Sequence, residues 1–572
     1  MADPQPVPHL IRAGARRPYL DFAFLAVLDA VAHFWRLRSF GLYEDDWYFN
    51  VGPYVWAARD WFGVMFRQMR EYVFGRPVEI LLLYTNGYIG YSLDSVTVLY
   101  GIAFLYSVVA TILVYVVLRH RFARDLALLA AMLFVLSPLT TVRQFLNTAY
   151  KMAPAYALVM GAMLLWLRRR PAPAYLLGGL SLLTYEWLFL LFLGAPLLER
   201  DLRFGSRRLW LHVAVCVLIM AAGFALRLAL EEQRVGVEVP EAPYFLSRAA
   251  HSLFFHLANI PLLFGNAVYL AVADRPLDGL VFGALLAGLL LWTQWRHSQA
   301  HGANADWPRA IAAGAAFAIL GLLLAFLPNP SDPFDTPRTL GRVTRVFGPA
   351  EFGVALLGAG LYGALHSAAG RPVRRLLTPA LAGGLGVLMV FQFVIQKDYV
   401  RAWEEHRSIL ARMIQLSPDA GPDTTIVIRL RWRDWDPFNT RFRVLAIGEE
   451  KLMFHRAPYW LFAYGEPRPN LYFVYSDRWL DHLQAGADGK LHWTRTDVPD
   501  LYAFDKPPLT PGKVIYLHAE LSGRIVRATE AYRVGDTVIT QASQPVQKSF
   551  WTTLKPSPLL KHVFPAGLPV DE

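Results

Sequence analysis

Long stretches without Asp, Glu, Lys or Arg recur in this chain and constrain its fold more than any other feature. Most of them approach the 20 or so apolar residues that a helix needs to cross the hydrocarbon core of a bilayer. A weaker span is expected at residues 20–39, which also contain Asp21, Asp29 and Arg36. The sequence therefore predicts a polytopic α-helical membrane protein. The charge-free stretches are residues 98–118, 126–142, 152–167, 209–226, 279–295, 310–331, 352–370 and 376–396.

The composition agrees with several membrane spans. Of the 572 residues, 55% are hydrophobic, 14% are aromatic and only 18% are charged. We attribute the net charge of +11 to membrane topology and to attraction by anionic lipid. No basic run is interleaved with a nucleic-acid-binding module, so membrane lipids and not nucleic acids are the expected partners. The single cysteine, Cys216, leaves no partner for an intrachain disulfide.

Clusters of basic residues set the expected topology, because cytoplasmic loops are rich in Lys and Arg. All of these clusters lie on one side if residues 40–97 form a long external loop, in which residues 78–93 are an interfacial helix. The same condition requires residues 173–198 to form a hairpin that enters and leaves on one side, with its tip at Tyr185-Glu186. The clusters occur at residues 119–124, 168–170, 200–208 and 371–375.

Residues 249–273 are apolar enough for a span, but one more crossing would put the basic residues 371–375 on the wrong side. We therefore expect an interfacial or re-entrant element within an external loop, 230–276. The result is about 11 membrane segments, counting the hairpin as two, with a cytoplasmic N-terminus. Residues 1–397 form the membrane domain. Residues 398–572 form a soluble extracytoplasmic domain, β-rich or α/β, with strands expected at TTIVIRL, RVLAIG, NLYFVYS, KVIYLHAE and DTVIT.

Three acids, Glu44, Asp45 and Asp46, follow the first expected span and precede a run of aromatic residues. A carboxylate that stays ionised and lies within hydrogen-bond reach of a hydroxyl serves as a general base. The alternative is structural, because acids cap helices and aromatic residues form the belt at the membrane surface. The residues alone leave both interpretations open.

The rest of the expected external loop carries a family resemblance. The stretch FGRPVEILLLYTNGYIGYSL places Gly-Arg-Pro ahead of the interfacial helix, and LLTYEWLF places an acid at the hairpin tip. In this order of elements, residues 20–200 resemble the GT-C glycosyltransferases. The order is similar to that of protein O-mannosyltransferases and of the lipid A aminoarabinose transferase. These polytopic enzymes take a sugar from a polyprenyl-phosphate carrier.

The resemblance implies an inverting sugar transfer at the inner membrane of a bacterium, in the synthesis of cell-envelope glycans. It makes Asp45 the catalytic base for an acceptor hydroxyl, with Asp46 as its neighbour, and places Arg76 near the carrier phosphate. Cations stabilise the departing phosphate; for each of them the alternative is an anchor to lipid phosphate. The candidates are Arg76, Arg143, Lys151, Arg338, Arg342 and Arg345 for the phosphate, and Trp47, Tyr48, Tyr84, Tyr185 and Glu186 for the substrates.

The resemblance does not require a cofactor, although the loop acids Asp332 and Asp335 are able to hold a divalent cation, Mg or Mn. His251 and His256 are five residues apart, a poor spacing for a metal pair on one helix face. Arg227 is expected to snorkel at the end of its span. The acceptor stays open between a glycan, a lipid and a protein. Competing hypotheses are a transporter or flippase of lipid-linked substrates, an oligosaccharide ligase or polymerase, and a non-catalytic scaffold.

Overall fold

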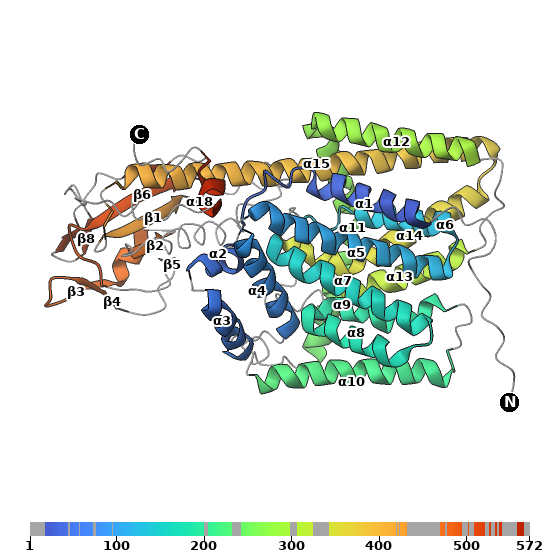
Figure 1. Ribbon diagram of the computed structural model, residues 1–572, viewed down its shortest axis with the longest axis horizontal. Helices are drawn as coiled ribbons and strands as arrows, with labels where there is room; N and C mark the ends of the chain where they lie inside the picture. Colours follow the sequence, from blue (N-terminus) through green and yellow to red (C-terminus); the bar gives the residue numbers. More distant parts are fainter. Residues whose placement is uncertain are drawn as a thin grey trace.

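A bundle of helices makes up most of the structure, and the strands gather beyond one end of it (Figure 1). Helix α15 (Arg371–Leu416) runs along the bundle and continues past it to the strands. We call the end of the bundle that carries α2 (Asp46–Val55), α3 (Ala58–Glu71) and α4 (Pro77–Ser92) the loop end. The computed structural model describes residues 18–43, 46–55, 58–71, 76–93, 95–199, 204–230, 242–297, 306–323, 342–418, 420–421, 424–431, 470–474, 477–494, 501–502, 508–520, 525–527, 532–534, 537–539 and 558–565.

Six helices in the described part of the chain are long and apolar enough to cross a membrane, as expected of an integral membrane protein. They are α5 (Val96–Arg121), α7 (Leu146–Leu167), α10 (Arg207–Ala229), α11 (Ala242–Asp274), α14 (Gly348–Ala368) and α15. The shorter helices beside them are α1 (Pro18–Phe34), α6 (Arg124–Val135), α12 (Leu277–His297), α13 (Trp307–Leu322) and the 3-10 helix η2 (Arg342–Phe347).

Small residues let the bundle helices approach closely. A Cβ on Gly353 of α14 would lie 2.1 Å from the backbone nitrogen of Ala318 in α13, and a Cβ on Gly321 would lie 2.5 Å from the backbone of Pro349. Such contacts replace the hydrophobic driving force that is weak between helices in lipid. They pack α13 tightly against α14, which carries η2 to the loop end.

The stretch 126–142 forms a shorter helix than expected. Helix α6 ends at Val135, because a Ser-Pro pair follows and proline disfavours helical backbone at and before its own position. The chain then runs as a buried loop through residues 136–145. The side-chain amide of Gln392 donates to the first two carbonyls of this loop.

The hairpin predicted for residues 173–198 is present. The rings of Tyr175 and Phe192, one from each arm, lie with their centroids 5.8 Å apart. The chain reverses at Tyr185, whose extended backbone separates the two helices. The predicted hairpin and its tip are therefore confirmed. Its helices are α8 (Pro171–Thr184), α9 (Glu186–Leu193) and the short η1 (Ala195–Leu198).

Helix α11 lies across the loop end. The ring of His256 packs 5.3 Å from that of Phe347, and Asp274 pairs with Lys397 at 2.6 Å. Both contacts lie near Thr141, whose N–H donates to η2 and whose carbonyl accepts from α15. Two positions about 27 Å apart along α11 thus contact the same end of the bundle. Because α11 is also long and apolar enough to cross a membrane, its interfacial placement stays a prediction.

The C-terminal region contains a mixed sheet with the strand order β5-β2-β1-β6-β7. Strand β1 is parallel to β2 and β6, whereas β5 and β7 add to the edges in antiparallel fashion. Ile426, Val427 and Ile428 are all buried, as expected of a central strand that is covered on both faces. The sheet joins the bundle through α15, because Arg527 donates to the carbonyl of Leu416.

Four of the five predicted strand runs form strands, and the fifth, RVLAIG, lies outside the described residues. Two small antiparallel hairpins, β3-β4 and β8-β9, accompany the sheet. The strands are β1 (Thr425–Arg431), β2 (Asn470–Val474), β3 (Leu483–Ala485), β4 (Leu491–Trp493), β5 (Leu501–Tyr502), β6 (Val514–Glu520), β7 (Ile525–Arg527), β8 (Tyr532–Val534) and β9 (Thr537–Ile539), with the short helices η3 (Asp477–His482) and α18 (Pro558–Val563).

Candidate functional site

We call Glu44, Asp45 and Asp46 the acid motif. Asp46 is the first residue of α2, and it joins this motif to α7. Its carboxylate is fully buried and accepts backbone N–H groups of Tyr43, Leu146 and Asn147 at 3.1, 3.3 and 2.7 Å. The last two donors belong to the first turn of α7, where N–H groups have no partners within the helix. Asp46 therefore caps α7 and fixes the acid motif to its N-terminus.

The surroundings of Asp46 give it a positioning role. Burial raises the pKa of Asp46 to about 7, against the lowering effects of the backbone donors of Asn147, Tyr43 and Leu146 and of the Lys151 charge. Three backbone donors hold the carboxylate inside the protein and away from solvent. That Asp46 takes part in catalysis stays a prediction.

Trp47 and Tyr84 pack inside the protein. The indole N–H of Trp47 donates to the carbonyl of Leu42 at 2.9 Å, and its ring is 1% exposed. The ring of Tyr84 is fully buried and stacks on Trp61 with centroids 4.4 Å apart. Both rings were predicted to contact a sugar. In this structure Trp47 instead packs α2 against α15 through Trp403, and Tyr84 joins α4 to Phe49 of α2 and Trp61 of α3.

Several predicted residues fall outside the described part of the chain. These are Glu44 and Asp45 of the acid motif, the loop residues Asp332, Asp335 and Arg338, and the side chains of Tyr48 and Arg342.

Two cationic and two anionic side chains meet beside the hairpin tip. Arg76 donates from Nε and Nη2 to the two oxygens of Glu186, at 2.6 and 2.5 Å, and its Nη1 lies 3.2 Å from Glu79. Lys151 of α7 pairs with the other oxygen of Glu79 at 3.1 Å. Burial lowers the pKa of Arg76, but the charges of Glu186 and Glu79 outweigh burial and hold that pKa well above its ordinary value. The guanidinium is therefore charged throughout the physiological range.

Two further cations surround this pair of carboxylates. Arg227 of α10 pairs with Glu186 at 3.2 Å, so its charge has a protein partner; that it snorkels to the membrane surface stays a prediction. Arg345 of η2 lies close enough to Lys151 and Tyr185 for their charges to interact. Among the described residues, Arg345 has no carboxylate partner.

We call Arg76, Lys151, Arg227, Arg345, Glu79 and Glu186 the cation cluster. Its four cations face two carboxylates, which leaves a surplus of two positive charges among the described residues. The cluster is partly accessible, since the side chain of Arg76 is 11% exposed and that of Arg227 is 19% exposed. The ring of Tyr185 lies under Arg76, 5.1 Å from its guanidinium carbon. Such a surplus of positive charge attracts anions.

The first turn of α7 joins the acid motif to the cation cluster. Asn147 donates its backbone N–H to Asp46, and its side-chain oxygen lies 3.5 Å from the ammonium group of Lys151 one turn further on. Asn147 therefore contacts both Asp46 of the acid motif and Lys151 of the cation cluster. The sequence predicted that Asp46, Arg76 and Lys151 belong to one site, and the fold brings these three residues into one region.

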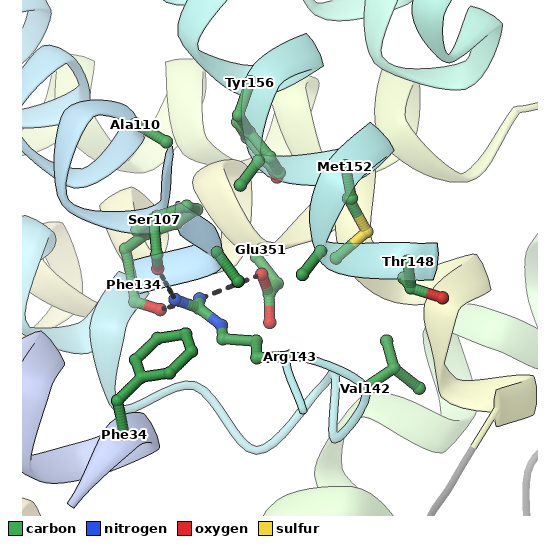
Figure 2. Close-up of a pocket in the computed structure, with 13 residues that line it drawn as sticks. Phe34, Ser107, Ala110, Phe134, Val142, Arg143, Thr148, Met152, Tyr156 and Glu351 are labelled. Carbon is green, nitrogen blue, oxygen red and sulfur yellow. Dashed lines mark hydrogen bonds and ion pairs between the residues drawn. The ribbon is translucent and has the colours of Figure 1, made fainter. Parts of the chain in front are cut away.

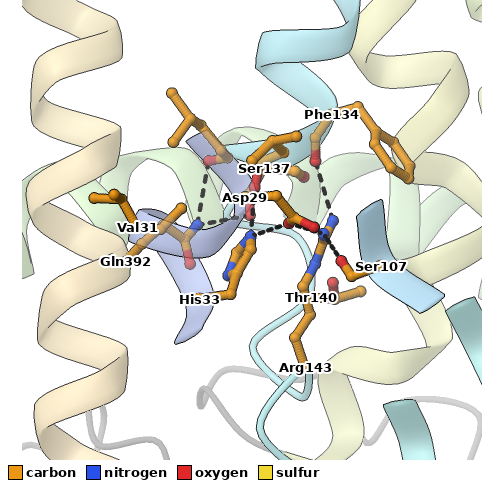
Figure 3. Close-up of polar contacts among 12 residues, drawn as sticks. Asp29, Val31, His33, Ser107, Phe134, Ser137, Thr140, Arg143 and Gln392 are labelled. Carbon is orange, nitrogen blue, oxygen red and sulfur yellow. Dashed lines mark hydrogen bonds and ion pairs between the residues drawn. The ribbon is translucent and has the colours of Figure 1, made fainter. Parts of the chain in front are cut away.

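Arg143 lies elsewhere, in a buried polar group inside the bundle. Its guanidinium extends from the loop before α7 and lies 3.5 Å from Asp29 (Figure 3). It lies 3.5 Å from Glu351 as well. It also donates to the carbonyl of Phe134 at 3.1 Å and to the hydroxyl of Ser107 at 3.4 Å. Two carboxylates already balance its charge. The predicted role of Arg143 in binding the donor phosphate therefore gains no support, and its contacts tie α1, α5, α6 and α14 together.

A small cavity adjoins this polar group. It has a volume of about 30 Å³, enough for one or two water molecules, and Arg143 and Glu351 form its polar wall (Figure 2). Apolar side chains such as Phe34 and Met152 form most of the rest. The cavity is far too small for a sugar phosphate.

Three members of the site were missed or misjudged from the sequence. Glu79 is three residues after Arg76, a spacing that places both on one face of a helix, so its pairing was predictable. Arg227 sits at the end of an apolar helix, where a lipid anchor is the simpler interpretation. Asn147 carries no signal, because its role depends on the cap that Asp46 provides.

The described residues contain no group of three or more His, Cys, Asp or Glu side chains arranged to hold a metal ion. The Nδ1 atom of His256 is hydrogen-bonded to the carbonyl oxygen of Ser252, 2.7 Å away. The loop acids proposed for Mg or Mn belong to the part of the chain that is not described.

Comparisons of the chain with protein-family models, with curated proteins and with solved structures gave no match.

Proposed function

We propose that this protein is a membrane glycosyltransferase that moves a sugar from a polyprenyl-phosphate donor to an acceptor hydroxyl, with inversion at the anomeric carbon. The main support is the surplus of two positive charges in the cation cluster. This cluster is joined to Asp46 of the acid motif through Asn147. The surplus fits one phosphate group, and the acid motif supplies a base. The basic clusters of the sequence put this chemistry on the extracytoplasmic side.

The charge of the cluster favours the released phosphate over the bound donor. A donor phosphodiester carries a single negative charge, whereas a phosphomonoester carries nearly two at neutral pH. Groups that bind the developing charge more strongly than the ground state lower the barrier. Glu79 and Glu186 hold Arg76 and Lys151 in place before the donor arrives, so no reorganisation is needed during the reaction.

Asp45 is the proposed general base. It accepts the proton of the acceptor hydroxyl while the hydroxyl oxygen attacks the anomeric carbon from the face opposite the phosphate. The bond from that carbon to the phosphate oxygen breaks, and the oxygen keeps the electron pair. Tyr43 and Asp46, which precede and follow Glu44-Asp45 in the sequence, are both buried and hydrogen-bonded.

The test is an assay of purified wild-type protein with polyprenyl-phosphate-linked hexoses and pentoses, together with a panel of glycan, lipid and peptide acceptors. Mass spectrometry measures free polyprenyl phosphate, and NMR gives the anomeric configuration of the product. We expect acceptor-dependent release with at least one donor and an inverted product. A retained configuration, or no release with any pair, contradicts the proposal.

A transporter or flippase of lipid-linked substrates is the second candidate, and the buried group of Asp29, Arg143 and Glu351 favours it. Ionisable side chains inside a membrane bundle commonly mark transport pathways. A flippase moves a labelled polyprenyl-phosphate sugar across liposomes without releasing phosphate, and Glu351→Gln abolishes that movement. A transferase releases the phosphate, and its chemical step does not involve this group.

A further inference from the structure

Helix α18, near the C-terminus, is attached at two points. Nε2 of His562 lies 2.9 Å from the carbonyl oxygen of Phe40, and because a carbonyl only accepts, Nε2 carries the proton. Arg407 of α15 donates from Nε to the carbonyl of Val563 at 2.7 Å. Burial lowers the pKa of His562, so the ring is neutral at physiological pH. The first attachment joins α18 directly to the chain before the acid motif.

Trp403 fills the space between α18 and that part of the chain. Its ring stacks on His562, with centroids 5.4 Å apart and the planes at 23°, and lies 6.1 Å from the ring of Trp47. A Cβ on Gly41 would lie 1.9 Å from the indole. Only glycine leaves room for this ring, so the backbone at Gly41 rests directly on it.

Residues 40–43 are fixed on their other side as well. The carbonyl of Gly41 accepts from the hydroxyl of Tyr100 at 2.6 Å, and its N–H donates to the hydroxyl of Tyr43 at 3.1 Å. That hydroxyl in turn donates to the carbonyl of Tyr399 at 2.8 Å. The segment that leads into the acid motif is therefore held between α5, α15 and α18.

We propose that His562 and Trp403 are positioning residues, through which the C-terminal region sets the place of the acid motif. The imidazole holds the carbonyl of Phe40, and the indole supports Gly41 and Trp47 on either side of the three acids. Loss of the imidazole frees one side of this segment while the hydrogen bonds to Tyr100 and Tyr399 remain. The acid motif then samples positions in which its base is out of reach of the acceptor hydroxyl.

The kinetic part of the inference rests on the proposed function. His562→Ala is expected to lower kcat about tenfold, the effect of losing one or two modest contacts, with the KM for the donor unchanged within about twofold. His562→Gln, whose amide N–H is able to reach the carbonyl of Phe40, restores most of the rate. The matched control is His492→Ala, because His492 is an exposed histidine of the same region and its ring bonds to Asp488, four residues away.

A second readout does not depend on activity. In a Cys216→Ser background, the thiol of Glu44→Cys is labelled with a water-soluble maleimide. His562→Ala is expected to raise the labelling rate at least about threefold, His562→Gln to return it toward the parent rate, and His492→Ala to leave it unchanged. Arg407→Gln, which removes the second attachment of α18, gives a smaller increase in the same direction.

The positioning role is overturned by a labelling rate that is the same in His562→Ala and its parent, or by a kcat of His562→Ala within twofold of an active wild type. Equal losses in His562→Ala and His562→Gln also overturn it, because the carbonyl contact then plays no part. A wild type that transfers no sugar refutes the proposed function instead, and the labelling rates still decide the inference.

Discussion

Arg345→Gln is the sharpest perturbation of the cation cluster. Among the described residues, Arg345 lacks a carboxylate partner, whereas Arg76 binds Glu186 through both oxygens. Replacing Arg76 would break the two-point contact with Glu186, whose remaining described ion pair is with Arg227, and destabilise the fold by up to about 3–5 kcal/mol. Replacing Arg345 removes a positive charge and leaves every ion pair of the cluster in place. Its effect on activity is therefore an effect on the bound anion.

The magnitude follows from Coulomb's law. A charge about 5 Å from the phosphate, at an effective dielectric constant of about 20, contributes about 3 kcal/mol, and solvent screening at a partly exposed site reduces this to about 2 kcal/mol. The corresponding loss in kcat/KM is roughly 30-fold to 150-fold. Because the developing phosphate charge exceeds that of the donor, we expect kcat to fall along with the rise in KM.

The assay is the initial rate of polyprenyl phosphate release over a range of donor concentrations. Arg67→Gln is the matched control, since Arg67 is an exposed arginine of α3 and the same charge is removed. It is expected to keep kcat/KM within twofold. If Arg345→Gln also keeps kcat/KM within threefold of an active wild type, the surplus charge does not serve the reaction.

Three further predictions concern stability, each read from thermal unfolding. Burial raises the pKa of Asp46 from 3.8 to about 7, so between these pH values the folded protein retains a proton that the unfolded chain has lost. The free energy of unfolding therefore falls as the pH rises from about 4 to 7, by up to about 1.4 kcal/mol per pH unit. Asp46→Asn removes this contribution, and an unchanged slope contradicts the assignment. Gly41→Ala forces the indole of Trp403 aside and costs about 1–3 kcal/mol; an unaltered midpoint would show that the ring moves freely. Arg143→Met removes the arginine that faces two buried carboxylates and costs about 3–5 kcal/mol; an unchanged midpoint would show that both carboxyl groups are protonated in the native state.

Charge pattern was enough to predict the hairpin at Tyr185 and the helix at residues 78–93. Both depend on where basic clusters lie relative to apolar stretches, and that relation is local in the sequence. The end of α6 was missed, because residues 136–142 are apolar and charge-free although they form a loop. Their carbonyls are satisfied by partners far along the chain, such as Gln392, and hydropathy does not report such partners.

The candidate site was predictable in part. Arg76, Lys151 and Glu186 were chosen as site residues from their places in three separate segments, and they lie in one cluster. The difference between Arg143 and Lys151 was not predictable. Both are cations near the start of α7, but one turns into the bundle toward Asp29 and the other toward the loop end. That choice depends on side-chain direction, which the sequence does not carry.

The most direct test of the central claim is the release of polyprenyl phosphate by wild type, Asp45→Asn and Glu44→Gln under identical conditions. The two variants lose one negative charge at adjacent positions, so they differ only in which acid is removed. The account predicts that Asp45→Asn loses at least about 100-fold in kcat, the usual contribution of a general base, and that Glu44→Gln stays within a few-fold of wild type. Equal turnover by Asp45→Asn and wild type would contradict it.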